Sequence, residues 1–193
     1  MSLVPVFQIG IWNAWIFMIW PWADTLAIRL IGLEVYQRAS GLPSEMKTSR
    51  SYRVVSYVSM TVDIMAVAYS IFLPLKLDTV WFYAGLTIFL TGLVVLLVAT
   101  FNFATTPLDV PITRGMYHYS RHPLYLASLL IYLSVGIASA SWVFLLVFVI
   151  QSVSIRIAAV GEEHYCLEKY GEAYRDYINK TPRWLGLPKS KSK

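Results

Sequence analysis

Charged residues are scarce in this sequence, and cysteine and histidine are scarcer still. Only 14% of the 193 residues are charged and 57% are hydrophobic, whereas about a quarter of the residues in a soluble domain are charged. The single cysteine, Cys166, excludes an intrachain disulfide and any metal cluster built on cysteine. The histidines His118, His122 and His164 are too scattered to predict a metal site. These shortages exclude an ordinary soluble domain and a disulfide-stabilised one, and we predict no metal.

Long stretches without charge are what the sequence has instead. They are residues 1–23, 79–108 and 123–155, together with 54–75, in which Asp63 is the one charged residue. A membrane-spanning helix needs about 20 consecutive, mostly apolar residues. The sequence therefore predicts an all-α, polytopic integral membrane protein with one domain over residues 1–193. The N-terminal stretch lacks basic residues ahead of its apolar core, so it is not expected to be a signal peptide.

The stretch 123–155 is too long for one span and short for two, and its centre, Gly136–Trp142, is rich in small residues. We predict that it forms a tight helical hairpin, which supplies the last two spans. Three further spans give five transmembrane helices in total, and they are predicted within Val4–Trp22, Val54–Leu75 and Val80–Asn102. For Asp63 we favour a hydrogen bond to a neighbouring Ser, Thr or Tyr over a contact with a substrate or cation.

The distribution of basic residues predicts the orientation in the membrane. Every Lys and Arg except Lys76 falls in segments that five spans place on one side, and this side is expected to be the cytoplasm. The N-terminus is then outside and the C-terminus cytoplasmic. The net charge of +5 is spread along these cytoplasmic edges, so no nucleic-acid partner is predicted. The basic tail, residues 188–193, is predicted to be disordered.

Two polar segments interrupt this apolar chain. Arg114–Tyr125 lies just before the hairpin, where Pro123 suits the first position of a helix whose free N–H groups favour anions. Its residues alone also fit an interfacial anchor of Arg and Tyr. The second segment begins at Glu162 and continues as a predicted cytoplasmic helical lid, in which Leu167, Tyr170, Tyr174 and Tyr177 recur at helical spacing. Taken together on one membrane face, the two segments favour a binding site.

Short motifs follow one another in a set order through this half of the chain. They are Gly115-Met-Tyr117, Arg121-His122-Pro123-Leu-Tyr125, Glu162-Glu163, Tyr170-Gly171 with Tyr174 and Tyr177, and Thr181-Pro182-Arg183. This order resembles the isoprenylcysteine carboxyl methyltransferase family, in particular its small prokaryotic and archaeal five-span members. Phospholipid N-methyltransferases and membrane sterol reductases share parts of it. The resemblance makes residues 109–184 the catalytic and cofactor-binding region.

The resemblance implies S-adenosylmethionine as the methyl donor and S-adenosylhomocysteine as a product. The absence of a GxGxxG motif and of alternating strands and helices excludes a Rossmann-type cofactor site. By resemblance, the cofactor-binding residues are Val110, Ile112, Tyr117, His118, His122, Pro123, Leu124, Tyr125 and Glu162. The residues predicted to act in catalysis are Arg121, Glu163 and Arg156.

The methyl acceptor is expected to be a lipophilic molecule that enters from the surrounding membrane lipids, while the donor enters from the cytoplasm. The resemblance implies a carboxylate acceptor, as in isoprenylcysteine methylation, and such an acceptor is already ionised and needs no base. An amine, as in phospholipid N-methylation, would need a base, for which Glu163 or His118 are candidates. A third alternative is an NADPH-dependent sterol-type reductase, but the sequence has no additional Arg/Lys cluster for the nucleotide phosphate.

Overall fold

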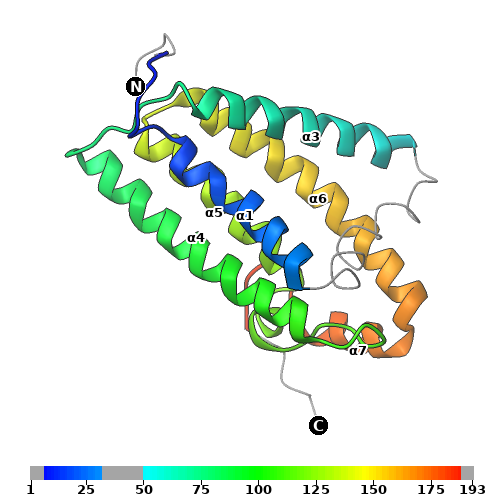
Figure 1. The fold of residues 1–193 in the computed structure, drawn as a ribbon. Helices are drawn as coiled ribbons and strands as arrows, with labels where there is room; N and C mark the ends of the chain where they lie inside the picture. Colours follow the sequence, from blue (N-terminus) through cyan, green and yellow to red (C-terminus); the bar gives the residue numbers. More distant parts are fainter. Residues whose placement is uncertain (1–6, 32–49, 188–193) are drawn as a thin grey trace.

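The computed structural model describes residues 7–31 and 50–187, and every regular element in this part of the chain is helical (Figure 1). The elements are α1 (Trp15–Ile31), α3 (Arg50–Ser70), α4 (Val80–Thr105), the 3-10 helix η1 (Gly115–His118), α5 (Pro123–Ala138), α6 (Trp142–Tyr170) and α7 (Glu172–Lys180). Within the described residues, an isolated bridge between Asn13 and Pro74 is the one strand-like pairing. The all-α prediction is confirmed for these residues.

The helices pack as a bundle around one apolar core. α4 packs along α5, α5 packs on α6, α3 lies along α6, and α1 contacts both α4 and α5 (Figure 1). Phe17 of α1 stacks on Phe89 of α4, with ring centroids 4.1 Å apart. Ile131 of α5 and Phe144 of α6 are fully buried in the same core. α7 crosses the far end of the bundle, where α6 ends.

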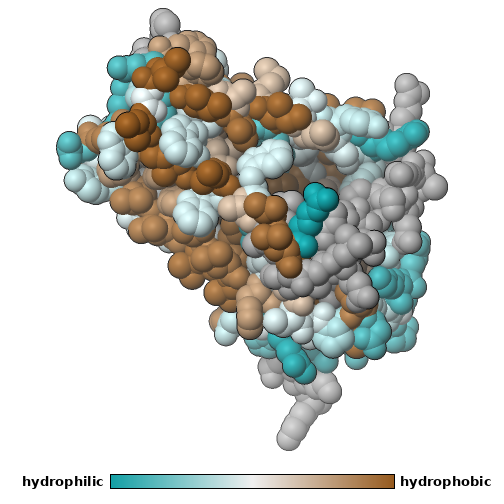
Figure 2. Space-filling model, in the orientation of Figure 1, coloured by the Kyte–Doolittle hydropathy of each residue, from teal (hydrophilic) through white to brown (hydrophobic). Residues whose placement is uncertain are grey.

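Two helices have the length and composition that a membrane span requires. These are α4 and α6, whereas α5 is apolar but has only 16 residues. Large apolar side chains of α4, including Leu90, Val94 and Phe101, are exposed on its outer face. Figure 2 shows the hydrophobic surface that they form along this helix. Exposed apolar area of this extent is expected where lipid replaces water. Membrane helices are therefore supported, while the count of five spans stays a prediction.

The predicted hairpin is present as α5, a turn at residues 139–141, and α6. Ala140 adopts a φ of 51°, and the backbone N–H of Ser141 donates to Gly136 O at 2.9 Å. The Ser141 hydroxyl then accepts a hydrogen bond from Phe144 N–H, which caps the start of α6. The small residues recognised in the sequence thus form the turn because two helices and their connection must fit closely there.

The first helix does not lie where the sequence placed it. α1 begins at Trp15 and continues to Ile31, beyond the predicted end near Trp22. The reason is a long-range contact, because the chain before α1 pairs with the loop that follows α3. The Asn13 amide donates to Gln8 O and to Ile71 O, each at 2.6 Å. These bonds hold the described residues before Trp15 outside the helix, in a path with bends and a turn.

The polar part of the C-terminal region also differs from the prediction. Glu162–Tyr170 continue α6 without a break, so α7 alone corresponds to the separate lid helix. Gly171 ends α6 with a φ of 54°, a conformation that glycine adopts without strain. The predicted disordered tail, residues 188–193, lies outside the described residues.

Candidate functional site

The loop before α5 is fastened to the end of α4. Gly115 opens η1 with a φ of +61°, in the left-handed region that favours glycine. An added Cβ at this position would lie 2.1 Å from Asn102 Oδ1 on α4. The same oxygen accepts a hydrogen bond from the Met116 N–H at 3.0 Å. Only a residue without a side chain lets the loop approach α4 so closely.

α7 is held against this loop by tyrosines. Tyr174 and Tyr177 are buried together with Tyr117 of η1 and Phe103 of α4 in a second apolar cluster. The Tyr177 hydroxyl donates to Tyr117 O at 2.5 Å. The loop before α5 and the region after α6 therefore lie side by side, as the sequence predicted.

The segment after α7, residues 181–187, folds back along the same loop. The Arg121 N–H donates to Pro182 O at 3.1 Å, and the Gly186 N–H donates to Tyr119 O at 3.1 Å. Between them, the Ser120 hydroxyl donates to Arg183 O at 3.3 Å. We call residues 181–187 the C-terminal segment. Its backbone hydrogen bonds place Arg183 and Trp184 beside His122 and α6.

Glu163 of α6 is buried where the loop and the C-terminal segment meet. Arg183 donates from Nε to Oε1 at 2.9 Å and from Nη2 to Oε2 at 2.7 Å, a two-point contact that matches both planar groups. Arg121 Nη2 lies 3.4 Å from Oε1, and His122 Nε2 lies 3.2 Å from the same oxygen. With its carboxylate occupied in this way, Glu163 links three separate parts of the chain.

Glu162 completes the ionic arrangement on the side that faces α5. The Tyr125 hydroxyl donates to Glu162 Oε1, and His122 Nδ1 lies 3.4 Å from Glu162 Oε2. Both ring nitrogens of His122 therefore face carboxylates. Burial lowers the pKa of His122, but its hydrogen bonds to Glu162 and Glu163 outweigh burial and raise this pKa above the ordinary value of 6.5. The geometry thus favours the protonated, doubly donating imidazole.

Arg121 has donors that the described residues do not satisfy. Its side chain is 9% exposed, and Nε and Nη1 are buried without a hydrogen-bond partner. Its only ion pair uses Nη2. A buried donor without a partner costs about 1–3 kcal/mol, and more when the group is charged. An anionic ligand group beside Arg121 would remove this cost.

Aromatic rings complete the surroundings of His122. The Tyr125 ring stacks on it with centroids 5.5 Å apart and planes 13° apart. The Trp184 indole lies 6.1 Å from it at an angle of 48°. We call Arg121, His122, Glu162, Glu163 and Arg183 the ionic cluster. Together with the rings of Tyr125 and Trp184, the ionic cluster offers anions, cations and flat π surfaces. These are the groups needed to bind a zwitterion that carries an aromatic base.

The structure brings most of the predicted site residues together. Five of them meet directly, namely Arg121, His122, Tyr125, Glu162 and Glu163. Tyr117 and Pro123 are buried beside them, and Leu124 packs against both apolar clusters. Ile112 packs against the second cluster only. These four serve the site by packing in the described structure.

Three predicted residues do not join this group. Arg156 is exposed on α6, and Val110 and His118 are exposed in the loop region before α5. The His118 ring packs edge-on against Tyr119, with centroids 5.3 Å apart. The roles of all three residues stay predictions.

Sequence reasoning did not select Arg183 and Trp184. Arg183 was recognised only as the last residue of the Thr181-Pro182-Arg183 motif, without a role in the site, and Trp184 follows it directly. The available signal was an arginine and a tryptophan shortly after the lid helix. The sequence does not show that the chain turns back after this helix, and only this reversal brings Arg183 to Glu163 and Trp184 to His122.

Comparisons with known proteins agree with this site. Residues 80–173 match the family model of phospholipid methyltransferases, a family in the same membrane methyltransferase superfamily as the isoprenylcysteine enzymes. The matched segment is just under half of the chain and runs from α4 to the start of α7. No curated protein and no solved structure gives a significant match. The match supports a membrane methyltransferase that uses S-adenosylmethionine, and the part of the chain that holds Arg121, His122, Glu162 and Glu163 is similar to the phospholipid methyltransferase family.

Proposed function

We propose that this protein transfers a methyl group from S-adenosylmethionine to a lipophilic acceptor at the cytoplasmic face of a membrane. The observation that carries the proposal is the ionic cluster, which unites the loop before α5, the end of α6 and the C-terminal segment. This cluster adjoins a cavity between the helices, and Tyr125 lines that cavity while its hydroxyl donates to Glu162. A donor site and an acceptor site would thus share one wall.

The residues present fit S-adenosylmethionine. The unpaired N–H groups of Arg121 suit its carboxylate, and Glu162 suits its amino group or its ribose hydroxyls. The rings of His122, Tyr125 and Trp184 suit the adenine or the cationic sulfur. When bound, the cofactor supplies an electrophilic methyl group on a sulfonium. The chain's own contribution is to orient the acceptor and exclude water, which strengthens attraction between an electron-rich acceptor and a cation.

For the acceptor, the structure adds an argument in favour of an amine. Among the described residues, those that line the cavity include Asp63 with its carboxyl group and no Lys, Arg or His. Such a cavity disfavours a carboxylate, and the match to phospholipid methyltransferases points in the same direction. An amine must lose a proton before it attacks, and Glu162 is the carboxylate placed next to the cavity wall. A carboxylate acceptor remains the second candidate, supported by the motif order that resembles the isoprenylcysteine enzymes.

The five-span arrangement, with the N-terminus outside, is part of the proposal. It is supported by the helical hairpin, by the apolar surface of α4, and by the position of Lys76. Lys76 lies in the loop at the end of the bundle opposite to α7, and its N–H donates to Ala138 O next to the hairpin turn. None of the other described Lys and Arg residues lies in this loop, which joins α3 to α4.

Binding calorimetry on the detergent-solubilised protein tests the donor. We expect saturable binding of S-adenosylhomocysteine and none of NADPH. Glu162→Gln should weaken S-adenosylhomocysteine binding by about tenfold, because it removes a charge from the site. Glu168→Gln, an exposed position on the same helix, is the matched control and should bind like the wild type. Binding of NADPH alone would refute the methyltransferase and favour the reductase.

A transfer assay with isotope-labelled S-adenosylmethionine tests the acceptor. Phosphatidylethanolamine, long-chain amines and S-prenylated cysteine are offered separately to the protein in lipid nanodiscs. We expect label in the amine acceptors. Label in prenylcysteine alone would establish the carboxylate candidate instead.

A further inference from the structure

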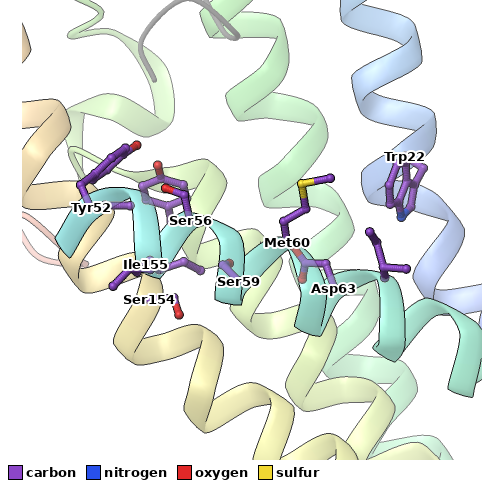
Figure 3. Close-up of a pocket in the computed structure, with 12 residues that line it drawn as sticks. Trp22, Tyr52, Ser56, Ser59, Met60, Asp63, Ser154 and Ile155 are labelled. Atoms are coloured by element: carbon purple, nitrogen blue, oxygen red, sulfur yellow. The ribbon is translucent and has the colours of Figure 1, made fainter. Parts of the chain in front are cut away.

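The cavity beside the site is lined mainly by α3. It has a volume of about 340 Å³, near the lower end of the roughly 300–1,000 Å³ of small-molecule pockets. Figure 3 shows side chains of α3 and α6 on its walls, with Trp22 of α1 facing them. The lining residues are Trp22, Tyr52, Val55, Ser56, Ser59, Met60, Asp63, Ile64, Tyr125, Ser154, Ile155 and Ala158.

The cavity is elongated and has two polar ends. The lining residues of α3 extend from Tyr52 to Ile64, which is about 18 Å of helix at 1.5 Å per residue. Tyr125 marks the end that meets the ionic cluster. Asp63 lies farther along and is hydrogen-bonded to Tyr132, seven residues after Tyr125 on α5. Two helical turns therefore separate the polar ends by about 10 Å.

Asp63 is held in place by neutral groups. The Tyr132 hydroxyl and the Gln151 amide both donate to Oδ1 of its carboxyl group. Gln151 is 1% exposed and is itself fixed by Ser59, whose hydroxyl donates to Gln151 Oε1 at 2.7 Å. The sequence predicted a hydrogen bond between Asp63 and a neighbouring Ser, Thr or Tyr, and the structure has this bond with Tyr132 as the partner. These contacts join α3 to α5 and α6.

The hydrogen bonds that join Asp63 to the neighbouring helices use only one of its two carboxyl oxygens, Oδ1. Among the described residues, Oδ2 has no hydrogen-bond partner, and no Lys, Arg or His lines the cavity that Asp63 borders. A carboxylate at membrane depth is costly unless a cation or several donors accompany it. Two neutral donors on a single oxygen provide no counterion for the ionised form of Asp63. A ligand in the cavity can supply one.

We propose that this cavity binds the lipophilic methyl acceptor and that Asp63 binds a second ammonium group of that molecule, which is not the reacting group and lies about 10 Å from the atom that is methylated. The apolar walls, including Val55, Met60 and Ile155, contact the chain between the two polar ends. Asp63 is therefore a specificity-determining residue, and it sets the depth at which the reacting end lies beside Tyr125. The statement that this ligand is the methyl acceptor rests on the function proposed above. The statement that the cavity binds an ammonium compound does not.

Short amphiphiles that differ only in the polar group test this inference. Octylamine, octanol and octanoate are titrated against the full chain in phosphatidylcholine nanodiscs, and binding is followed by tryptophan fluorescence. Because Trp22 lines the cavity, Trp22→Phe identifies the part of the signal that reports on it. We expect octylamine to bind most tightly and octanoate least. Equal affinity for octylamine and octanol would overturn the role of charge.

Two variants locate the binding site. Asp63→Asn keeps the shape and an acceptor for Tyr132 but removes the charge, so it should weaken octylamine binding by about tenfold or more and leave octanol unchanged. Ala158→Phe fills the cavity from α6 without touching the Asp63 hydrogen bonds, and it should abolish the Trp22 response to octylamine. If Asp63→Asn fails to fold, the second variant still decides, because octylamine binding that survives Ala158→Phe lies elsewhere and refutes the proposal.

Calorimetry with S-adenosylhomocysteine on the same samples separates the two proposals. Octylamine binding without S-adenosylhomocysteine binding would leave a ligand cavity but refute both the acceptor assignment and the proposed function. S-adenosylhomocysteine binding without a preference for octylamine would leave the methyltransferase and refute the role of Asp63. Both kinds of binding, with Asp63→Asn selective for the amine, would support the inference.

Discussion

At the scale of single residues, the site depends on Glu163, because one buried carboxylate connects three segments of the chain. It contacts Arg183 at two points, and Arg121 and His122 at one point each. The Glu163 and Arg121 side chains are 8% and 9% exposed. Removing one partner of a buried ionic contact leaves the others as uncompensated charges, which costs more than the net value of the pair.

Glu163→Gln should therefore destabilise the protein by about 3 kcal/mol, since it leaves Arg121 and Arg183 without their shared anion. Differential scanning fluorimetry in detergent measures the shift in Tm. Glu172→Gln is the control, because its pair with Arg175 is largely exposed, at 82% and 65% of the two side chains. A Tm for Glu163→Gln as high as that of the control would show that the cluster does not hold the segments together.

His122 makes stability depend on pH. Its pKa is raised in the folded protein, so folding favours the protonated form. This contribution is complete below the unfolded value of about 6.5 and is lost as pH rises through the higher folded value. As pH rises above about 6.5, Tm should therefore fall more steeply in the wild type than in His122→Asn. Parallel curves for the two proteins would contradict this assignment.

The residues of the site differ in how far sequence could identify them. His122, Glu162 and Glu163 stand in short motifs, so their chemistry and order were readable, and the structure confirms that they meet. Arg156 was selected because it precedes Glu162 in the sequence, yet it is exposed on α6. Arg183 was omitted because its contact with Glu163 depends on the path of the C-terminal segment. The order of motifs indicates which residues belong to the site. Which of them are in contact depends on the face of the helix that each occupies and on where the chain reverses direction.

At the scale of helices, α4 and α5 approach each other along a row of small residues. Gly85, Gly92 and Ala99 recur every seven residues on α4, and all three are buried. A Cβ added at Gly85 would lie 2.6 Å from the Cβ and the backbone N of Ala138. Small residues of this kind let helix backbones approach closely in membranes, where packing rather than water release drives association.

Gly85→Ala should separate α4 from α5 and destabilise the protein by about 1–3 kcal/mol, because overpacking here meets backbone as well as side chain. Gly92→Ala should cost less, since its nearest neighbour, Leu130 Cβ, would be 3.0 Å away and belongs to a side chain. Thermal unfolding of both variants in the same detergent gives the order. The reverse order would contradict the close contact at Gly85.

Helix positions were readable where they depend on local sequence and unreadable where they depend on distant contacts. The hairpin and the start of α4 at Val80 follow from the lengths of apolar runs and from the small residues between them. α1 was misplaced because its start depends on Asn13, which binds the loop after α3 about 60 residues away. Apolar composition alone cannot show that the residues before Trp15 lie outside the helix.

At the scale of the whole molecule, the two ends of the bundle differ in chemistry. One end holds η1, α7, the C-terminal segment and the ionic cluster, whereas the opposite end holds the short loop after α3 and the hairpin turn (Figure 1). Between them lies the apolar surface of α4 (Figure 2). Because the ionic cluster lies at one end and an apolar surface separates the two ends, we expect the site to face a single aqueous compartment.

Cysteine labelling should show the two ends in different compartments. In a Cys166→Ala background, Lys76→Cys and Arg175→Cys place one thiol at each end, and both positions are exposed. A membrane-impermeant thiol reagent added to intact cells should label Lys76→Cys, and it should label Arg175→Cys only after permeabilisation. Labelling of Arg175→Cys in intact cells would reverse the proposed orientation.

The C-terminal segment is also translated after every helix of the described bundle, and this order affects biosynthesis. A nascent chain can complete α1, α3, α4, α5 and α6 while Glu163 still lacks Arg183. A chain that stops before Thr181 would thus lack the contact that completes the ionic cluster beside the proposed ligand pocket. On the function proposed above, we expect assembly of the helices and the ability to hold a ligand to be separate stages of maturation.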